Sequence, residues 1–181
     1  MAIRWHLKKG QTMYYPDLSP YTNMINAREP LVDDAPQALS VGWLEAGHPF
    51  AQGGASNEFM ARLWTLGRAP VNLMRGFHEC DFCSDPSFSY LNVRQGDEEL
   101  GMGNGEIWVF SNDHKVYIAP TLIYHYITHH RYLPPEPFIH AVLRAPLPDT
   151  PEYDRLAGQF MWGKIMHRKK EIERRLAQGN Q

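Results

Sequence analysis

The sequence predicts a single mixed α+β domain, and three observations lead to that prediction. At 181 residues the chain is about as long as one ordinary domain. Short apolar runs bounded by turn residues, typical of strands, lie in its middle, and segments with helical periodicity lie on either side. The only two cysteines, Cys80 and Cys83, lie between the first predicted helix and the predicted strands, in a C-x-x-C spacing. We therefore expect an α+β core in which a zinc knuckle, a β-hairpin and a helix meet, similar to the treble-clef arrangement of zinc domains.

The N-terminal part is expected to be an irregular wrap around this core. Prolines and glycines interrupt its periodic patterns before any of them runs the length of a helix. Aromatic residues are expected to pack this wrap, namely Tyr14, Tyr15, Tyr21 and Trp43. A first helix follows, with Ser56 as its N-cap and Gly67 as its stop.

The middle of the chain predicts three strands, Phe88–Val93, Glu106–Phe110 and Val116–Ala119. The last two flank Ser111-Asn112-Asp113-His114, whose small polar residues favour a turn, so 106–119 is expected to be a β-hairpin. The glycine-rich run 101–105 precedes a strand rather than a helix, which predicts a turn and not a phosphate-binding loop.

Helices are predicted after the hairpin. Pro120 is favoured at a first helical position, and the helix it opens has to end before Pro134. A short helix is expected over 135–143 and a long one over 152–178, after a proline-rich linker. We assign residues 1–145 to the domain and 146–181 to a C-terminal helical extension. From Lys164 onward its apolar stripe is too thin to hold it on the core, so this half is expected to project.

The C-x-x-C spacing predicts a metal site, because a short loop can direct two thiolates onto one ion. Two further ligands are available on the helix after the hairpin, where His125 and His129 stand i, i+4 on one face. We therefore predict a Zn²⁺ site formed by Cys80, Cys83, His125 and His129. His78 and His130 lie near the same elements, and either is an alternative for one of the two histidines.

A redox pair, a hydrolase site and a nuclease site are the alternatives to this zinc site. A redox pair normally opens a helix after a strand, whereas the segment after Cys83 is predicted to be strand. Glu79 beside His78 allows a zinc-dependent hydrolase, although the order of these residues differs from that of the zinc deaminases. Glu106 and His114 in the hairpin allow a metal-dependent nuclease. Since four protein ligands close a zinc site, we predict a structural ion and no catalytic residues.

Composition limits the classes of partner. The chain carries a net charge of −2, and no apolar run is long enough to cross a membrane. It shows neither the apolar core nor the cleavage site of a signal peptide, which predicts a cytoplasmic protein without a membrane partner. The run 167–170, with Arg174 and Arg175, is basic, but Glu171 and Glu173 offset it. A nucleic-acid-binding regulator therefore remains an alternative and not the main prediction.

The runs RGFHECDFC, GNGEIWVF and VYIAPTLIYHYITHHRYLPPEPFIHAV resemble a family of small bacterial proteins that has no assigned activity. Its members share an R-G-[FY]-H-x-C-x-x-C block and a later A-P-x-L-I-Y-H-Y-[IV]-x-x-H block. The resemblance covers residues 70–142 and implies the same four metal ligands. It also implies an accessory or immunity protein of a bacterial toxin system. The function expected from the sequence is a non-catalytic, zinc-stabilised module that binds another protein, such as a cognate toxin.

Overall fold

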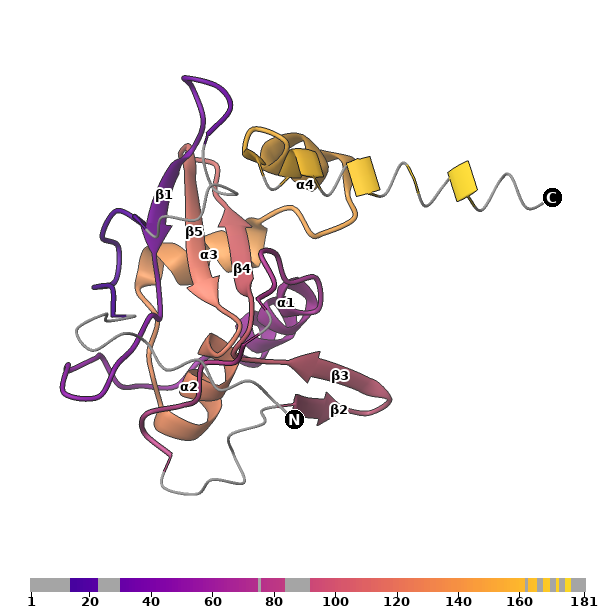
Figure 1. Cartoon of the computed structure of the whole chain (residues 1–181). Helices are drawn as coiled ribbons and strands as arrows, with labels where there is room; N and C mark the ends of the chain where they lie inside the picture. Colours follow the sequence, from indigo (N-terminus) through magenta and orange to yellow (C-terminus); the bar gives the residue numbers. More distant parts are fainter. Residues whose placement is uncertain are drawn as a thin grey trace.

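A three-stranded sheet lies at the centre of the computed structural model (Figure 1). Its strands are β1 (Gln37–Ser40), β4 (Glu106–Phe110) and β5 (Lys115–Pro120), in the order β1-β5-β4. β1 runs parallel to β5, and β4 runs antiparallel to it. The structure describes residues 14–22, 30–74, 76–83, 92–161, 163–165, 168–169, 172 and 175–176.

The predicted hairpin is present as β4 and β5. Its register pairs Glu106 with Pro120 at the open end and Phe110 with Val116 near the turn. The turn is closed by a backbone hydrogen bond from Ser111 to Lys115, and His114 adopts a positive φ of 61° within it. Histidine, like Asn and Asp, adopts positive φ more often than most residues, and the small polar residues before it favour a turn.

Three helices cover one face of the sheet: α1 (Asn57–Gly67), α2 (Ile123–His130) and α3 (Glu136–Arg144). α1 begins as predicted, because the Ser56 side chain accepts a hydrogen bond from the Phe59 backbone N–H at 3.2 Å. On this face Ile107, Val109 and Tyr117 of the sheet pack in one cluster with apolar residues of all three helices. Cys80 belongs to this cluster, and Cys83 packs against it.

The opposite face is covered by α4 (Pro151–Ala157) and by the residue Phe160 that follows it. Sheet residues and covering residues form a second cluster that includes Trp108, Phe110, Val116, Ile118, Tyr153, Ala157 and Phe160. With both faces buried, β4 and β5 read as nearly unbroken apolar runs rather than alternating ones. The first part of the predicted extension, residues 146–181, therefore contributes to the packing of the sheet. The boundary near Ala145 remains a prediction.

The N-terminal wrap packs through its aromatic residues as expected. The rings of Tyr15 and Tyr21 lie 5.9 and 5.3 Å from that of Trp43, and the Tyr14 ring stacks on His48. The expectation of a wholly irregular segment was wrong for 37–40, which form strand β1. Its partner β5 lies far along the chain, and a four-residue strand after Pro36 has no local signal of parallel pairing.

A two-stranded ribbon, β2 (Asn92–Gln95) and β3 (Glu98–Gly101), projects from the body in Figure 1. Gly96 in its turn has a φ of +61°. The predicted strand Phe88–Val93 overlaps β2 only at Asn92 and Val93, and its remaining residues lie outside the described part of the chain. The glycine-rich run 101–105 leads from β3 to β4, as a connecting turn should.

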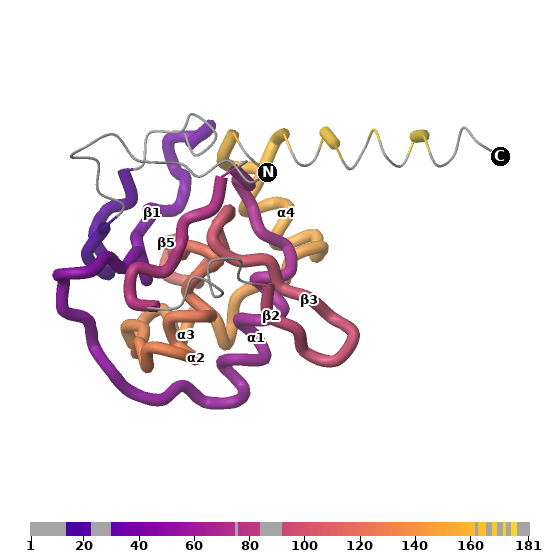
Figure 2. The backbone as a smooth tube through the Cα atoms, turned by 60° about the horizontal axis from the view of Figure 1, so that its bottom comes forward, coloured from indigo at the N-terminus to yellow at the C-terminus, as the bar shows by residue number. Residues whose placement is uncertain are grey.

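The described residues beyond Phe160 are helical and lead away from the body (Figure 2). Their apolar side chains are largely exposed: Ile165 at 49%, Ile172 at 50% and Leu176 at 65%. This agrees with the prediction that a thin apolar stripe cannot hold the second half of the extension on the core.

Candidate metal centre

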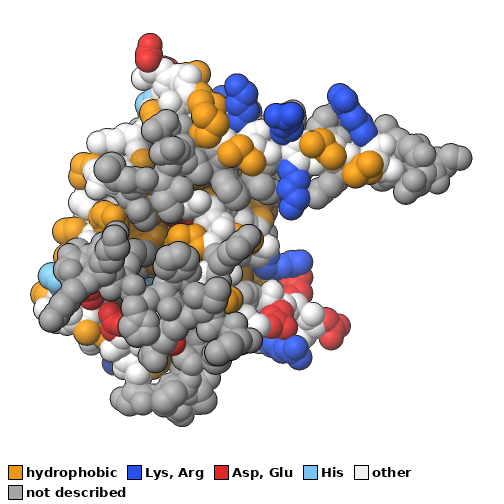
Figure 3. All heavy atoms as spheres, viewed as in Figure 1, with side chains coloured by type: hydrophobic (Ala, Val, Ile, Leu, Met, Phe, Trp, Pro, Cys, Tyr) orange, Lys and Arg blue, Asp and Glu red, His pale blue; other side chains and the backbone are white. Residues whose placement is uncertain are grey.

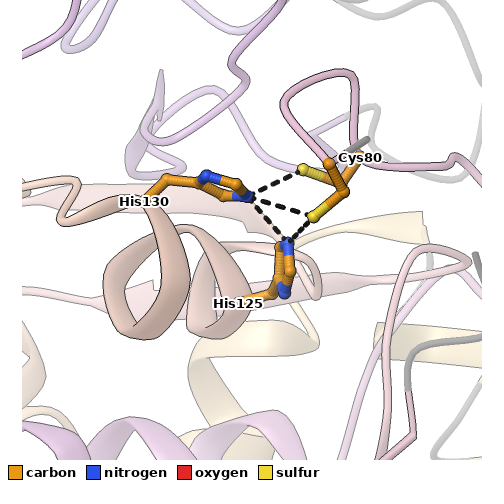
Figure 4. A group of neighbouring side chains, drawn as sticks. Cys80, His125 and His130 are labelled. Carbon is orange, nitrogen blue, oxygen red and sulfur yellow. Dashed lines mark hydrogen bonds between the residues drawn. The ribbon is translucent and has the colours of Figure 1, made fainter. Parts of the chain in front are cut away.

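Four side chains converge between the loop that follows Val71 and the end of α2: Cys80, Cys83, His125 and His130. The Cys80 Sγ lies 3.2 Å from the His130 Nε2, and the Cys83 Sγ lies 3.3 Å from the Nε2 atoms of both histidines. The two Nε2 atoms are 3.1 Å apart. Figure 4 shows the rings of His125 and His130 directed at the cysteine sulfurs, so all four possible ligand atoms face one point.

The cysteine side of the group is a tight turn on an otherwise irregular loop. The Cys83 N–H donates to the Cys80 carbonyl at 3.4 Å, which closes the turn and directs both thiols the same way. Further back, the N–H groups of Met74 and His78 donate to Asn104 and Gly103 at 2.7 Å each. These contacts fix the loop to the connection between β3 and β4.

Gly103 is required at this contact. It has a φ of +85°, a conformation that side-chain-bearing residues rarely adopt. A Cβ at this position would lie 2.6 Å from the His78 carbonyl oxygen. Its own N–H donates to the Thr121 Oγ1 at 2.9 Å, which also anchors the loop to the chain just before α2. The glycine-rich run thus positions the cysteine loop.

The histidine side of the group is the last turn and a half of α2. His125 is fully buried, whereas His130 is half-buried at the final helical residue. Arg131 ends the helix in a left-handed conformation with a φ of 57°. The His125 Nδ1 is buried without a hydrogen-bond partner among the described residues, so packing rather than an acceptor orients this ring.

His129, the fourth ligand predicted from the i, i+4 spacing, does not point at the sulfurs. Its ring stacks on that of His125, with centroids 4.6 Å apart and planes at 23°, and its Nδ1 lies 2.8 Å from the Thr128 Oγ1. The structure brings together three of the four predicted ligands, and His130, named as an alternative, takes the remaining place. His78 is not in the group and contributes its backbone to the Gly103 contact.

The donor set fits a tetrahedral zinc ion. Zinc bonds of ~2.3 Å to sulfur and ~2.0–2.1 Å to nitrogen imply S···N edges of about 3.6 Å and an N···N edge of about 3.4 Å. The observed S···N separations of 3.2 and 3.3 Å and the N···N separation of 3.1 Å are each a few tenths of an ångström shorter. A slight opening of the group therefore gives the geometry of a Cys₂His₂ zinc site.

Burial sets the protonation of these groups before any ion binds. It lowers the pKa of His125 to about 4, with the neighbouring His129 and His130 adding to the effect, and it also lowers the pKa of His130. Both imidazoles are therefore neutral ligands at neutral pH. Burial raises the pKa of Cys80 to about 12, so this thiol keeps its proton unless a cation favours the thiolate.

Aromatic side chains close the surroundings of the group. Phe82 lies between the two cysteines in sequence. The centroid of its ring is 5.5 Å from that of His130, 5.9 Å from that of Tyr126 and 5.3 Å from that of Phe50. Such an apolar shell limits the access of water to the ligands.

The residues considered for nuclease chemistry are not brought together. Glu106 is buried and accepts hydrogen bonds from the Tyr21 hydroxyl, the Asn72 amide and the Trp108 indole N–H. It lies at the open end of the hairpin, whereas His114 lies in the turn at the other end, 3.3 Å from Asp34. The burial of Glu106 was not predicted from the sequence, because two of its three partners, Tyr21 and Asn72, lie far from it along the chain.

Comparison with known proteins identifies one family. The model of a domain of unknown function (DUF7919) matches residues 13–143, which include all four residues of the group. No curated protein and no solved structure matches the chain. Among the described residues, no helix is both long enough and apolar enough to span a membrane.

Proposed function

The chain belongs to the DUF7919 family, a domain of unknown function, and we propose from its own residues that it is a non-catalytic, zinc-stabilised module that acts by binding another protein. The observation that carries the proposal is the set of four converging ligands, Cys80, Cys83, His125 and His130. Four protein ligands complete a tetrahedron, and a zinc ion held in this way is typical of structural sites.

The surroundings of the ligands favour a structural ion over a catalytic one. A catalytic zinc site keeps one position open for water and places a general base beside it. Here Glu79 and Asp81, the two carboxylates adjacent in sequence to Cys80, are not among the grouped residues, and the Phe82 ring lies 5.5 Å from that of His130. Such a site would join the cysteine loop to α2 rather than activate a water molecule.

A loop fixed by the ion would present apolar side chains to solvent. Leu73, Met74 and Phe77 precede the cysteines, and their exposed fractions are 55, 39 and 39%. Large apolar side chains exposed together are a common feature of protein-binding surfaces. A partner protein is therefore the occupant proposed for this loop, and the cognate toxin of a bacterial immunity system is the partner class that the sequence resemblance suggests.

The metal part of the proposal is tested by elemental analysis of the purified chain, with one zinc ion per chain expected. Replacement of zinc by Co²⁺ should give the visible absorption of tetrahedral cobalt with two thiolates, and His130→Ala should remove it. His129→Ala is the matched control and should keep the spectrum. A folded chain without metal, or a spectrum that depends on His129 and not on His130, would contradict the assigned site.

The non-catalytic part is tested with Glu79→Ala, which should retain zinc, thermal stability and biological activity. Loss of activity with zinc and stability intact would favour the hydrolase instead. Binding to the product of an adjacent toxin gene should weaken in Met74→Asp and Phe77→Asp, and Leu18→Asp, at a similarly exposed leucine elsewhere, is the control for a general effect of the added charge.

A further inference from the structure

The C-terminal segment differs in charge from the rest of the chain. Residues 164–175 hold six of the 18 Lys and Arg residues but only two of the 20 Asp and Glu residues. The segment therefore carries a charge of +4, and the remainder of the chain carries −6. A basic segment on an acidic body is electrostatically suited to bind a second acidic body.

The same segment has an apolar stripe. Ile165, Ile172 and Leu176 are spaced i, i+7 and i+11, which places them along one side of a helix. All three are about half exposed or more. Figure 3 shows Lys and Arg side chains interleaved with hydrophobic ones along this projecting segment. Helices that dock into protein grooves present this kind of narrow apolar line with charges beside it.

A cavity of about 520 Å³ lies next to the root of the segment, by which we mean residues 159 and 160 just before it. Phe160, Leu31, Val32 and Asp33 are among the residues that line it. Backbone contacts hold the root beside this cavity. Pro30 pairs with Phe160 in an isolated bridge, and the Leu31 N–H donates to the Gln159 carbonyl at 2.8 Å.

The cavity offers apolar contacts and acidic side chains, the two features that suit a basic helix with an apolar stripe. Leu31 and Val32 expose 37 and 47% of their surface, so the cavity offers apolar contact area. Asp33 lines it, and the neighbouring Asp34 has a side chain that is 99% exposed. The acidic rim complements Lys164 and Arg168, which flank Ile165 on the segment.

We infer that the C-terminal segment of one chain docks into the Phe160–Asp33 cavity of a second copy of this chain. Because each copy has both the segment and the cavity, the contact is made twice around a two-fold axis. The segment leads away from the body in Figure 1, and so away from the cavity beside its own root. A second copy is thus placed to receive it. This dimer goes beyond the proposed function and does not rest on the metal site.

Charge disfavours the other occupants. Two segments of +4 would repel each other in a parallel helix pair. Glu171 and Glu173 interrupt the basic run, which weakens it as a site for the phosphates of nucleic acid or of an anionic membrane. Neither residue opposes docking onto a protein surface that offers apolar contacts and a local acidic rim.

The first experiment measures the mass of the full chain in solution by sedimentation equilibrium. We expect a dimer that dissociates as salt is raised, and a monomer after deletion of residues 164–181. Ile172→Asp should raise the dimer dissociation constant at least about tenfold, since it places a charge in the contact. Leu18→Asp, at an exposed leucine on the body, is the control and should leave the dimer intact.

A charge exchange then distinguishes docking on the body from pairing of the two segments. One variant carries Asp33→Lys and Asp34→Lys, and the other carries Lys164→Glu and Arg168→Glu. Each should be monomeric alone, because like charges then meet at the exchanged positions: Lys164 and Arg168 face two lysines in the first variant, and two glutamates face Asp33 and Asp34 in the second. Mixed together they should form a heterodimer, in which both contacts again join opposite charges.

Three results would overturn the inference. The first is a monomeric full chain at high concentration and low salt. The second is a dimer that is unaffected by the changes at Asp33 and Asp34, since that would show pairing of the two segments. The third is a monomer whose segment binds phosphatidylserine vesicles or a DNA duplex. Zinc is measured in every preparation, so a monomer with one zinc per chain rejects the dimer alone, whereas a metal-free dimer rejects the metal site alone.

Discussion

The metal corner and the α4 face of the sheet are held together by different means. On the α4 face, ordered strands meet aromatic rings: Trp108 and Phe160 have centroids 5.2 Å apart, and Phe110 and Tyr153 5.4 Å. At the metal corner, the cysteine loop contains no strand or helix from residue 72 to 83 in its described part. Apolar burial can fix the first region. In the second, four side chains that could hold a metal ion converge instead, and this difference shows where an ion would contribute most to the fold.

Removal of one ligand is expected to have the largest effect. His130→Ala leaves three ligands and should abolish tight zinc binding, because metal affinity in such sites is part of the folding free energy. A loss of several kcal/mol of unfolding free energy is expected, since structural zinc in small sites contributes on the order of 10 kcal/mol of apparent binding energy. The measurement is urea unfolding together with zinc content.

His129→Ala is the matched control for that prediction, because it removes an adjacent, exposed imidazole that stacks on His125. It should retain one zinc ion and most of the stability. Equal losses of zinc and of unfolding free energy in His129→Ala and His130→Ala would mean that the two histidines share the ligand position.

Phe160→Ala should have the next largest effect and should act on the other region. The side chain is 2% exposed and packs on Trp108, so its loss leaves a cavity on the α4 face. Truncations of buried phenylalanine typically cost about 3–5 kcal/mol. Zinc stoichiometry should nevertheless stay at one per chain while the thermal midpoint falls. Loss of zinc in this variant would show that the two regions are coupled and not independent.

Several parts of both regions could be predicted from the sequence, because the signals for them lie in short stretches of the chain. The hairpin follows from a polar turn between two apolar runs, α1 from an N-cap serine, and the cysteine pair from its spacing. β1 could not be predicted, because what stabilises it is pairing with β5, from Gln37 with Lys115 to Ser40 with Ile118. A pairing that spans so much of the chain leaves no periodic pattern in a four-residue strand.

The fourth ligand shows the same limit at the level of one side chain. The i, i+4 rule correctly places His129 on the same face as His125, and for that reason the two rings stack. The other histidine of the group, however, is His130 at the last residue of α2, where the helix stops at Arg131 with a φ of 57°. Helical periodicity describes a continuing helix. It does not describe the direction of His130, the last residue before the chain turns.

Gly103→Ala is expected to have a smaller effect, confined to the metal corner. The added Cβ would meet the His78 carbonyl oxygen at 2.6 Å and would need a strained backbone, at a cost of roughly 1–3 kcal/mol. Since the cysteine loop must shift, zinc affinity in a chelator competition should fall while the sheet remains folded. Gly47→Ala is the control: it also has a positive φ, but nothing lies within 4 Å of its Cβ position. Similar losses of zinc in the two variants would contradict a specific role for the loop contact.

Asp17 gives the smallest expected effect. Its carboxylate accepts hydrogen bonds from the Gly42 N–H at 2.8 Å and from the hydroxyl of Tyr132, which follows α2. Burial nevertheless raises the pKa of Asp17 above its usual value near 3.8, and the two hydrogen bonds offset this only in part. The folded state therefore favours the protonated carboxyl. Its contribution to stability is complete below the unfolded pKa and is lost as the pH rises through the raised folded pKa.

Asp17→Asn should remove that pH dependence, because the amide stays neutral and its oxygen can still accept both hydrogen bonds. The unfolding free energies of the two proteins should run in parallel at acid pH, and the difference should shift in favour of the variant as the pH rises from about 4 to 7. Protonation of the zinc ligands at acid pH affects both proteins alike, so it cancels in that difference. A variant that instead loses stability steadily toward neutral pH would show that the ionised carboxylate stabilises the fold through its hydrogen bonds with Gly42 and Tyr132.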